Sequence, residues 1–216
     1  MANILIIGAS KGIGLATVHE GLEQSHSVTA FARTATQIQA EHERLTKLNG
    51  DARDEGALEN AMSGHDAVIM TLGVPFNAKM LTGPISLFSE ATIAVLEAMQ
   101  ANGIDRLIAV TGFGAGDSRR AISPFQQLPF NAVFGRAYAD KSRQEELIKA
   151  SDLQWTLVRP GVLTNQRKTE TYNIATKIGE MKNGIISRAD VAHFLIGAAV
   201  SNDYVGQGPV LSKPFL

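Results

Sequence analysis

The sequence predicts an α/β protein in which a doubly wound parallel sheet carries helices on both faces. Short unbroken apolar runs alternate with segments of helical spacing, and the first apolar run leads into a glycine-rich turn before a helix. Apolar runs of this kind suit strands that are buried on both faces of a parallel sheet. The chain has 216 residues and no linker rich in proline and serine, so we expect one domain spanning residues 1–216.

The individual elements follow from the same two patterns. The predicted strands cover residues 4–7, 28–31, 45–48, 67–70, 107–110 and 155–158. The predicted helices cover residues 13–24, 35–44, 55–62, 86–102, 141–150 and 189–200. Ser187 is expected to cap the last helix, and Gly103 is expected to end the fourth one in the left-handed conformation.

Three connections are predicted to form substrate loops, at residues 74–85, 112–137 and 163–184. Long unstructured connections are uncommon in compact domains and are often functional. These connections follow predicted strands at their carboxyl ends, which is where open α/β sheets bind ligands.

Composition excludes several classes of protein. Lys plus Arg is 20 and Asp plus Glu is 21, a balance that argues against a nucleic-acid partner. There is no cysteine, so disulfides and thiolate chemistry are excluded. No apolar stretch approaches the ~20 residues of a membrane span, and the five histidines lack metal-ligand spacing. We therefore expect a soluble cytoplasmic protein without a metal or membrane partner, monomeric or a small homo-oligomer.

The glycine-rich turn is the strongest motif. Gly8 would allow the tight turn, Gly12 would let the backbone approach a pyrophosphate, and Gly14 would let the helix pack against the strand. Amide groups at the helix start would then hold the anion, with Ser10, Lys11 and Ile13 beside them. The alternative is an ordinary tight turn.

The G-x-x-x-G-x-G spacing resembles that of the short-chain dehydrogenase/reductase superfamily, whose fold is of the Rossmann type. The resemblance implies that the end of the second strand selects the cofactor. That end carries Arg33 and Thr34 and no acid, and Lys11 adds a second cation, so NADPH is expected over NADH. The alternative is that both cations are solvated surface charges.

The resemblance implies further cofactor contacts in chain order. Asp51 and Ala52 would lie at the adenine edge, although Asp51 could instead cap a turn. The other implied contacts lie after the fourth, fifth and sixth strands: Thr71, Leu72, Gly73, Thr111, Lys141, Pro160, Gly161 and Val162. Pro160 and Gly161 could also be ordinary turn residues.

The implied catalytic residues depart from the pattern of the superfamily's alcohol dehydrogenases. Those enzymes use Ser, Tyr and Lys, with Tyr four residues before Lys. Here Tyr138 stands three residues before Lys141, and Thr111 is the hydroxyl that remains where Ser is expected. The run from Lys141 to Pro160 resembles the atypical branch. Residues 66–69 and 186–192 resemble the flavin reductase-like group that includes biliverdin-IXbeta reductase.

Aromatic side chains gather in the predicted loops and suggest a pocket for a flat substrate. The candidates are Phe76, Phe113, Phe125, Phe130 and Phe134. A small local core or an oligomer contact is the alternative. The function hypotheses are an NADPH-dependent reductase of a flavin, quinone or tetrapyrrole, a nitrogen-regulator-like NADP(H) sensor without turnover, and an NAD-dependent epimerase or dehydratase.

Overall fold

A computed structural model describes residues 1–74, 85–122 and 124–214, and for residues 124–134 it describes the backbone alone. One eight-stranded sheet runs through the molecule in the order β3-β2-β1-β4-β5-β6-β10-β8. Its strands are β1 (Asn3–Ile7), β2 (Ser27–Ala32), β3 (Leu45–Asn49), β4 (Ala67–Met70), β5 (Arg106–Val110), β6 (Gln154–Pro160), β8 (Asn173–Ala175) and β10 (Val210–Ser212). All pairs are parallel except β10 with β8.

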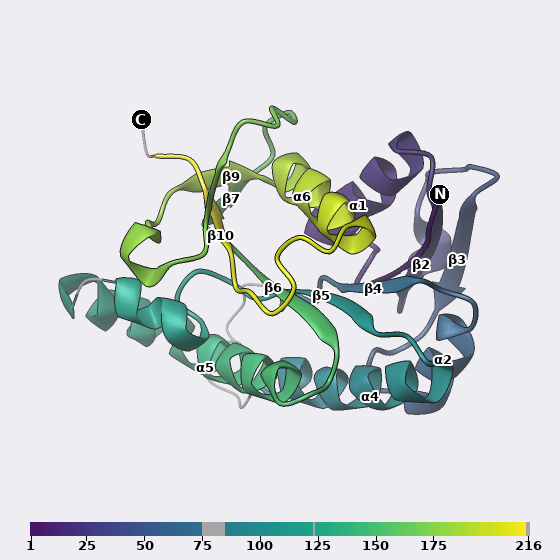
Figure 1. The fold of residues 1–216 in the computed structure, drawn as a ribbon, viewed down its shortest axis with the longest axis horizontal. Coiled ribbons are helices and arrows are strands. Elements are labelled where there is room, and N and C mark those ends of the chain that lie inside the picture. The colour runs from purple at the N-terminus through teal and green to yellow at the C-terminus, as the bar shows by residue number, and fades with distance from the viewer. Residues whose placement is uncertain (75–84, 123, 215–216) are drawn as a thin grey trace.

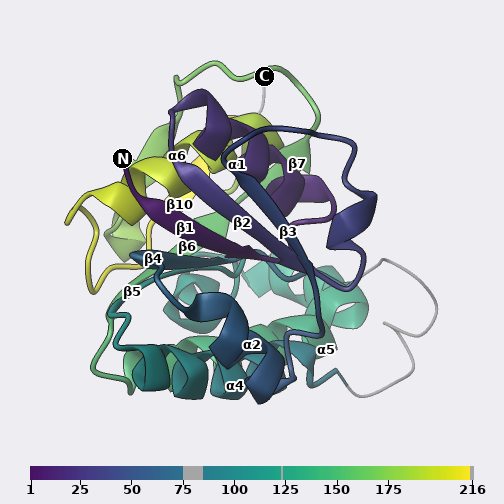
Figure 2. The same cartoon turned by 90° about the vertical axis from the view of Figure 1, so that its right-hand side faces the viewer.

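Helices cover both faces of the sheet, as the sequence predicts. Figures 1 and 2 show α1 (Gly12–Glu23) and α6 (Arg188–Val200) side by side on one face. The opposite face carries α2 (Glu55–Met62), α4 (Leu87–Asn102) and α5 (Pro124–Lys149). The remaining elements are η1 (Ala35–Gln37), η2 (Gly116–Ala121), η3 (Ile178–Glu180) and the small pair β7 (Val162–Thr164) and β9 (Ile185–Ser187).

The core lies in two layers, one on each face of the sheet. In β1, Ile4 and Ile6 face the α1 and α6 layer, while Leu5 and Ile7 face the α2 and α4 layer. All four side chains are 0% exposed. This two-sided burial explains why the strand is an unbroken apolar run rather than an alternating one.

The strand order reverses at β1, which pairs with β2 on one side and β4 on the other. Open α/β sheets bind ligands in the crevice at such a reversal, outside the carboxyl ends of the strands. The glycine-rich turn after β1 therefore lies at the position where the fold places a ligand.

Three predicted segments differ in the structure. The helix expected over 35–44 is reduced to η1, because the Asn49 side chain accepts from the Thr36 amide and donates to its hydroxyl. These bonds compete with helical ones. The connection 112–137 was expected to be a loop, but α5 begins at Pro124 and η2 precedes it. The connection 163–184 contains β8 and η3.

Both predicted helix ends are confirmed. The Ser187 hydroxyl accepts from the Asp190 amide at the start of α6 at 2.9 Å. Gly103 closes α4 with φ +66°. Among the described residues, no helix is long and apolar enough to cross a membrane.

Candidate functional site

The three loop glycines form a close-fitting turn against the end of β4. Gly8 and Gly12 have φ values of +87° and +62°, in the left-handed region that favours glycine. A Cβ on Gly14 would overlap the Gly8 carbonyl and lie 2.6 Å from Thr71 Oγ1. Gly14 therefore allows α1 to pack against the turn, and the loop has the geometry expected from its spacing.

The start of α1 is an exposed anion cradle. Lys11, at the N-cap, makes no side-chain capping bond, and the first turn has no acidic residue. By contrast, Asp54 caps α2 with its side chain. A Cβ on Gly12 would find one described neighbour within 4 Å, the Nε of Arg188 at 4.0 Å. The free amides and the positive helix end suit a pyrophosphate.

Arg33 and Asp51 lie at the ends of β2 and β3. Arg33 is exposed, and none of the hydrogen bonds or ion pairs found among the described residues involves it, although its charge helps to lower the pKa of Asp51. Asp51 accepts from the amide and the guanidinium of Arg53, whose hydrogen bonds lower the Asp51 pKa to about 2. The Asp51 carboxylate therefore caps a turn, which is the alternative to a contact at the adenine edge. Ala52 beside it is buried.

The residues that follow the carboxyl ends of β4 and β6 lie on the same side of the sheet as the glycine-rich turn. Thr71 is tied to β1, since its hydroxyl donates to the Ile7 carbonyl at 2.8 Å. A Cβ on Gly161 would overlap the Gly184 carbonyl oxygen, so a close backbone approach requires glycine there. Leu72 is half-buried, whereas Gly73 and Val162 are exposed.

The Thr111 hydroxyl is turned into a buried ionic network. It donates to Glu145 Oε1 at 2.8 Å, and the same carboxylate oxygen accepts from Arg159 Nε at 2.9 Å. Glu145 and Arg159 are each 1% exposed, and Asp117 adds a second carboxylate to Arg159. The Thr111 hydroxyl therefore already donates its proton to Glu145, and it is not free as the serine hydroxyl of the alcohol dehydrogenases is.

Lys141 lies under the carboxyl end of β5. Its ammonium is 4.0 Å from the centroid of the Phe88 ring and 3.4 Å from the Val110 carbonyl oxygen. Burial lowers the Lys141 pKa to about 8, although Glu145 and Asp140 oppose the shift. Asp140 itself accepts from the Phe88 and Ser89 amides and so caps α4 from α5.

Tyr138 packs against the chain that leaves β5. Its hydroxyl lies 2.7 Å from the position that a Cβ on Gly112 would occupy. Burial raises the Tyr138 pKa above its usual range. The alcohol dehydrogenase mechanism needs a tyrosine whose pKa is lowered toward neutrality, so this environment is unfavourable for that role.

The aromatic candidates divide into three groups. Phe113 is 7% exposed and packs in a small cluster with Ile122, Met181 and Val210, which is the local core named as the alternative to a substrate pocket. The backbones of Phe125, Phe130 and Phe134 lie in α5. The side chains of those three, and Phe76 altogether, lie outside the described residues.

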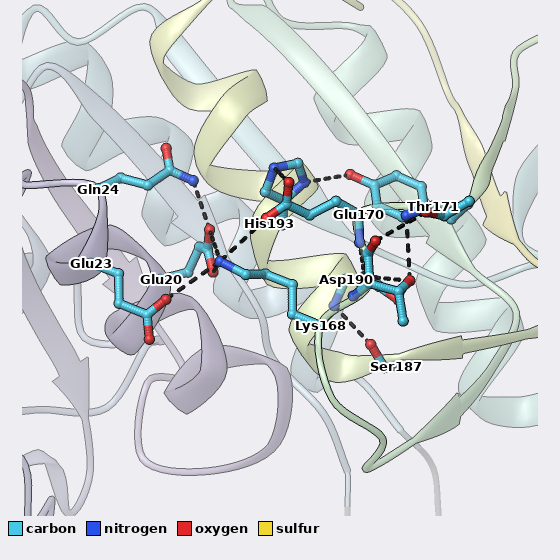
Figure 3. Close-up of polar contacts among 11 residues, drawn as sticks. Glu20, Glu23, Gln24, Lys168, Glu170, Thr171, Ser187, Asp190 and His193 are labelled. Atoms are coloured by element: carbon cyan, nitrogen blue, oxygen red, sulfur yellow. Dashed lines mark hydrogen bonds and ion pairs between the residues drawn. The ribbon is translucent and has the colours of Figure 1, made fainter.

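The segment after β7 is anchored to α1 and α6, as Figure 3 shows. Lys168 bonds the buried Glu20 carboxylate of α1, with Nζ at 2.9 Å from Oε2. Asp190 of α6 accepts from the amides of Thr169 and Glu170 at 2.7 and 2.8 Å. These bonds hold residues 168–170 against the C-terminal half of α1 and the first turn of α6.

A match to a known family identifies the class of cofactor. The profile of a family described as NAD(P)H-binding matches residues 8–202. The chain belongs to this NAD(P)H-binding family. The match covers the glycine-rich turn, every main-sheet strand from β2 to β8, and all of α6.

Proteins similar to this chain are named as a reductase, an oxidoreductase and a sugar epimerase. ChuY, an anaerobillin reductase from Escherichia coli O157:H7, is 26% identical with a TM-score of 0.80, over 99% of this chain and 98% of that one. Oxidoreductase aflX of Aspergillus parasiticus is 24% identical, over 94% of this chain and 79% of its own. YhfK of Bacillus subtilis, an uncharacterized sugar epimerase, is 27% identical, over 90% and 86%.

Residues that the sequence analysis missed belong to long-range contacts. Glu145 with Arg159, and Asp140 at the start of α4, meet across two or more elements. Arg188 reaches Gly12 from the far end of the chain. One available signal was a charge next to apolar residues, since Arg159 directly follows Leu157 and Val158 in a predicted buried strand.

Proposed function

We propose that the protein is an NADPH-dependent reductase of a planar conjugated acceptor of the flavin, quinone or tetrapyrrole type. The observation that carries this proposal is that the hydroxyl groups of Thr111 and Tyr138 are both poorly suited to donate a proton to a substrate. Thr111 donates its proton to Glu145, and burial raises the pKa of Tyr138. The site thus has a dinucleotide cradle, and neither of its two candidate hydroxyls is a tuned proton donor, which suits an acceptor that takes its proton from water.

Bound NADPH would supply the hydride, and the chain's own residues would hold and orient the reactants. The amides at the start of α1 would bind the pyrophosphate, and Arg33 with Lys11 would bind the 2′-phosphate. Lys141 would face the nicotinamide ribose from beneath the end of β5. The resemblance to ChuY over nearly the whole of both chains supports a reductase within this family.

The test is oxidation of NADPH by the purified protein with a panel of flavins, quinones, linear tetrapyrroles and aldehydes. We expect turnover with conjugated acceptors and little with aldehydes. A preference for aldehydes would contradict the proposed acceptor class. Tight NADPH binding without turnover on any acceptor would favour the sensor hypothesis instead.

A further inference from the structure

Arg188 stands over the glycine-rich turn, although 176 positions separate it from Gly12 in the sequence numbering. It is the first residue of α6, and its Nε lies 4.0 Å from the point that a Cβ on Gly12 would occupy. No other described atom lies within 4 Å of that point, so this side of the turn has room for a group bound by the α1 amides. The guanidinium therefore borders the anion cradle.

The position of Arg188 is fixed from both sides. Its Nη1 donates to Asn165 Oδ1 at 2.6 Å. The pairing of β7 with β9 sets Thr164 beside Ser187, so Asn165 and Arg188 leave the two strands together. The Ser187 cap fixes the start of α6. Figure 3 shows the bonds of Asp190 that tie the neighbouring segment to this helix.

The charge of Arg188 is not balanced within the described protein. Its hydrogen-bond partner is a neutral amide, and none of the ion pairs among the described residues includes it. Lys168 and Lys213, which lie near the same segment, both pair with carboxylates. A positioned, uncompensated guanidinium beside a set of free amides is suited to a pyrophosphate, whose two phosphates carry one negative charge each.

We propose that Arg188 is a pyrophosphate-binding residue, which closes the cradle of α1 from the side of α6. This inference rests on the dinucleotide binding of the proposed function. It assigns the C-terminal half of the chain a direct contact with the cofactor. Because the pyrophosphate is common to NADH and NADPH, Arg188 contributes affinity for both and selects neither.

The experiment is calorimetric titration of the Arg188→Gln variant with NADPH, NADH and adenosine 2′-monophosphate, which lacks a pyrophosphate. We expect binding of both dinucleotides to weaken about 10- to 100-fold, as for the loss of a charge-assisted hydrogen bond. Binding of adenosine 2′-monophosphate should be unchanged. The matched control is Arg167→Gln, which removes an exposed positive charge from the same region and should bind all three probes as the wild type does.

A second variant separates contact from folding. Arg188→Lys keeps the charge and should recover part of the lost affinity, while the thermal midpoint of the free protein stays the same in all variants. Equal affinities of wild type and Arg188→Gln would overturn the inference and leave the proposed function standing. A loss confined to NADPH would overturn the pyrophosphate assignment. A wild type that binds no dinucleotide would overturn both.

Discussion

Glu145 and Arg159 form a two-pronged ion pair in the interior, with Arg159 Nε and Nη2 each donating to a different carboxylate oxygen. The pair joins α5 to β6 directly behind Thr111. Both side chains are 1% exposed, so water does not solvate either charge if its partner is removed. Breaking such a pair by removing one partner leaves an uncompensated buried charge.

We therefore expect Glu145→Gln to lower the free energy of unfolding by about 3 kcal/mol. This is the lower end of the usual range, because Asp117 still contacts Arg159. Urea unfolding measures the change. Glu146→Gln is the control, since its pair with Arg143 is exposed and should contribute at most about 0.5 kcal/mol. Similar unfolding midpoints for the two variants would contradict this account of the buried pair.

Arg33→Ala should weaken NADPH binding by about 1.5–3 kcal/mol and leave NADH binding unchanged. The reason is that Arg33 is exposed at the end of β2 and unpaired within the described chain. Titration with both dinucleotides measures the difference between the two affinities. Arg143→Ala serves as a control for loss of a surface charge. Equal binding of NADPH and NADH by the wild type would show that Arg33 is a solvated charge only.

Gly12→Ala should abolish dinucleotide binding and lower the free energy of unfolding by about 1–2 kcal/mol, the cost of a side chain in the left-handed region. Gly64→Ala is a matched control. Gly64 has φ +77° and no described atom within 4 Å of its Cβ position, but it lies beside Asn3 at the amino end of β1, whereas the glycine-rich turn follows the carboxyl end. It should lose similar stability and keep full binding. If both variants lost dinucleotide binding, the loss in Gly12→Ala would be due to impaired folding and not to the glycine-rich turn.

Tyr138→Phe should keep most of the reductase activity, while Lys141→Ala should weaken cofactor binding. Tyr138 is buried against Gly112, and its raised pKa makes it a poor acid near neutral pH. A general acid contributes about 10²–10⁴-fold in rate. Steady-state rates with the best acceptor give the comparison, and a loss of that size in Tyr138→Phe would restore a tyrosine-based mechanism.

The lowered pKa of Lys141 predicts a dependence of stability on pH. Between about 8, its value in the folded protein, and its usual value of 10.5, the unfolded chain binds more protons than the folded one. Stability conferred through this group therefore rises with pH across that window, by about 3 kcal/mol. Unfolding of wild type and Lys141→Met should be compared at the two ends of the window. The variant should lack this rise, and parallel curves would refute the assignment.

Much of the fold was predictable because its signals are local. The unbroken run of β1, the glycine spacing and the Ser187 cap each depend on residues close together in the chain. The 3-10 turn at η1 was not predictable, because Asn49 acts on Thr36 from the next strand. The inward turn of the Thr111 hydroxyl depends on Glu145 of α5, and no short stretch of sequence carries that information.

The place of β10 in the sheet has a consequence for the order of folding during synthesis. This strand lies between β6 and β8, pairing parallel with the first and antiparallel with the second. It also supplies Val210 to the cluster around Phe113. Until residues 210–212 have left the ribosome, β6 is an open edge with unpaired backbone groups. The nascent chain can thus assemble its first six strands early, but it must protect the β6 edge from other chains until residues 210–212 pair with it.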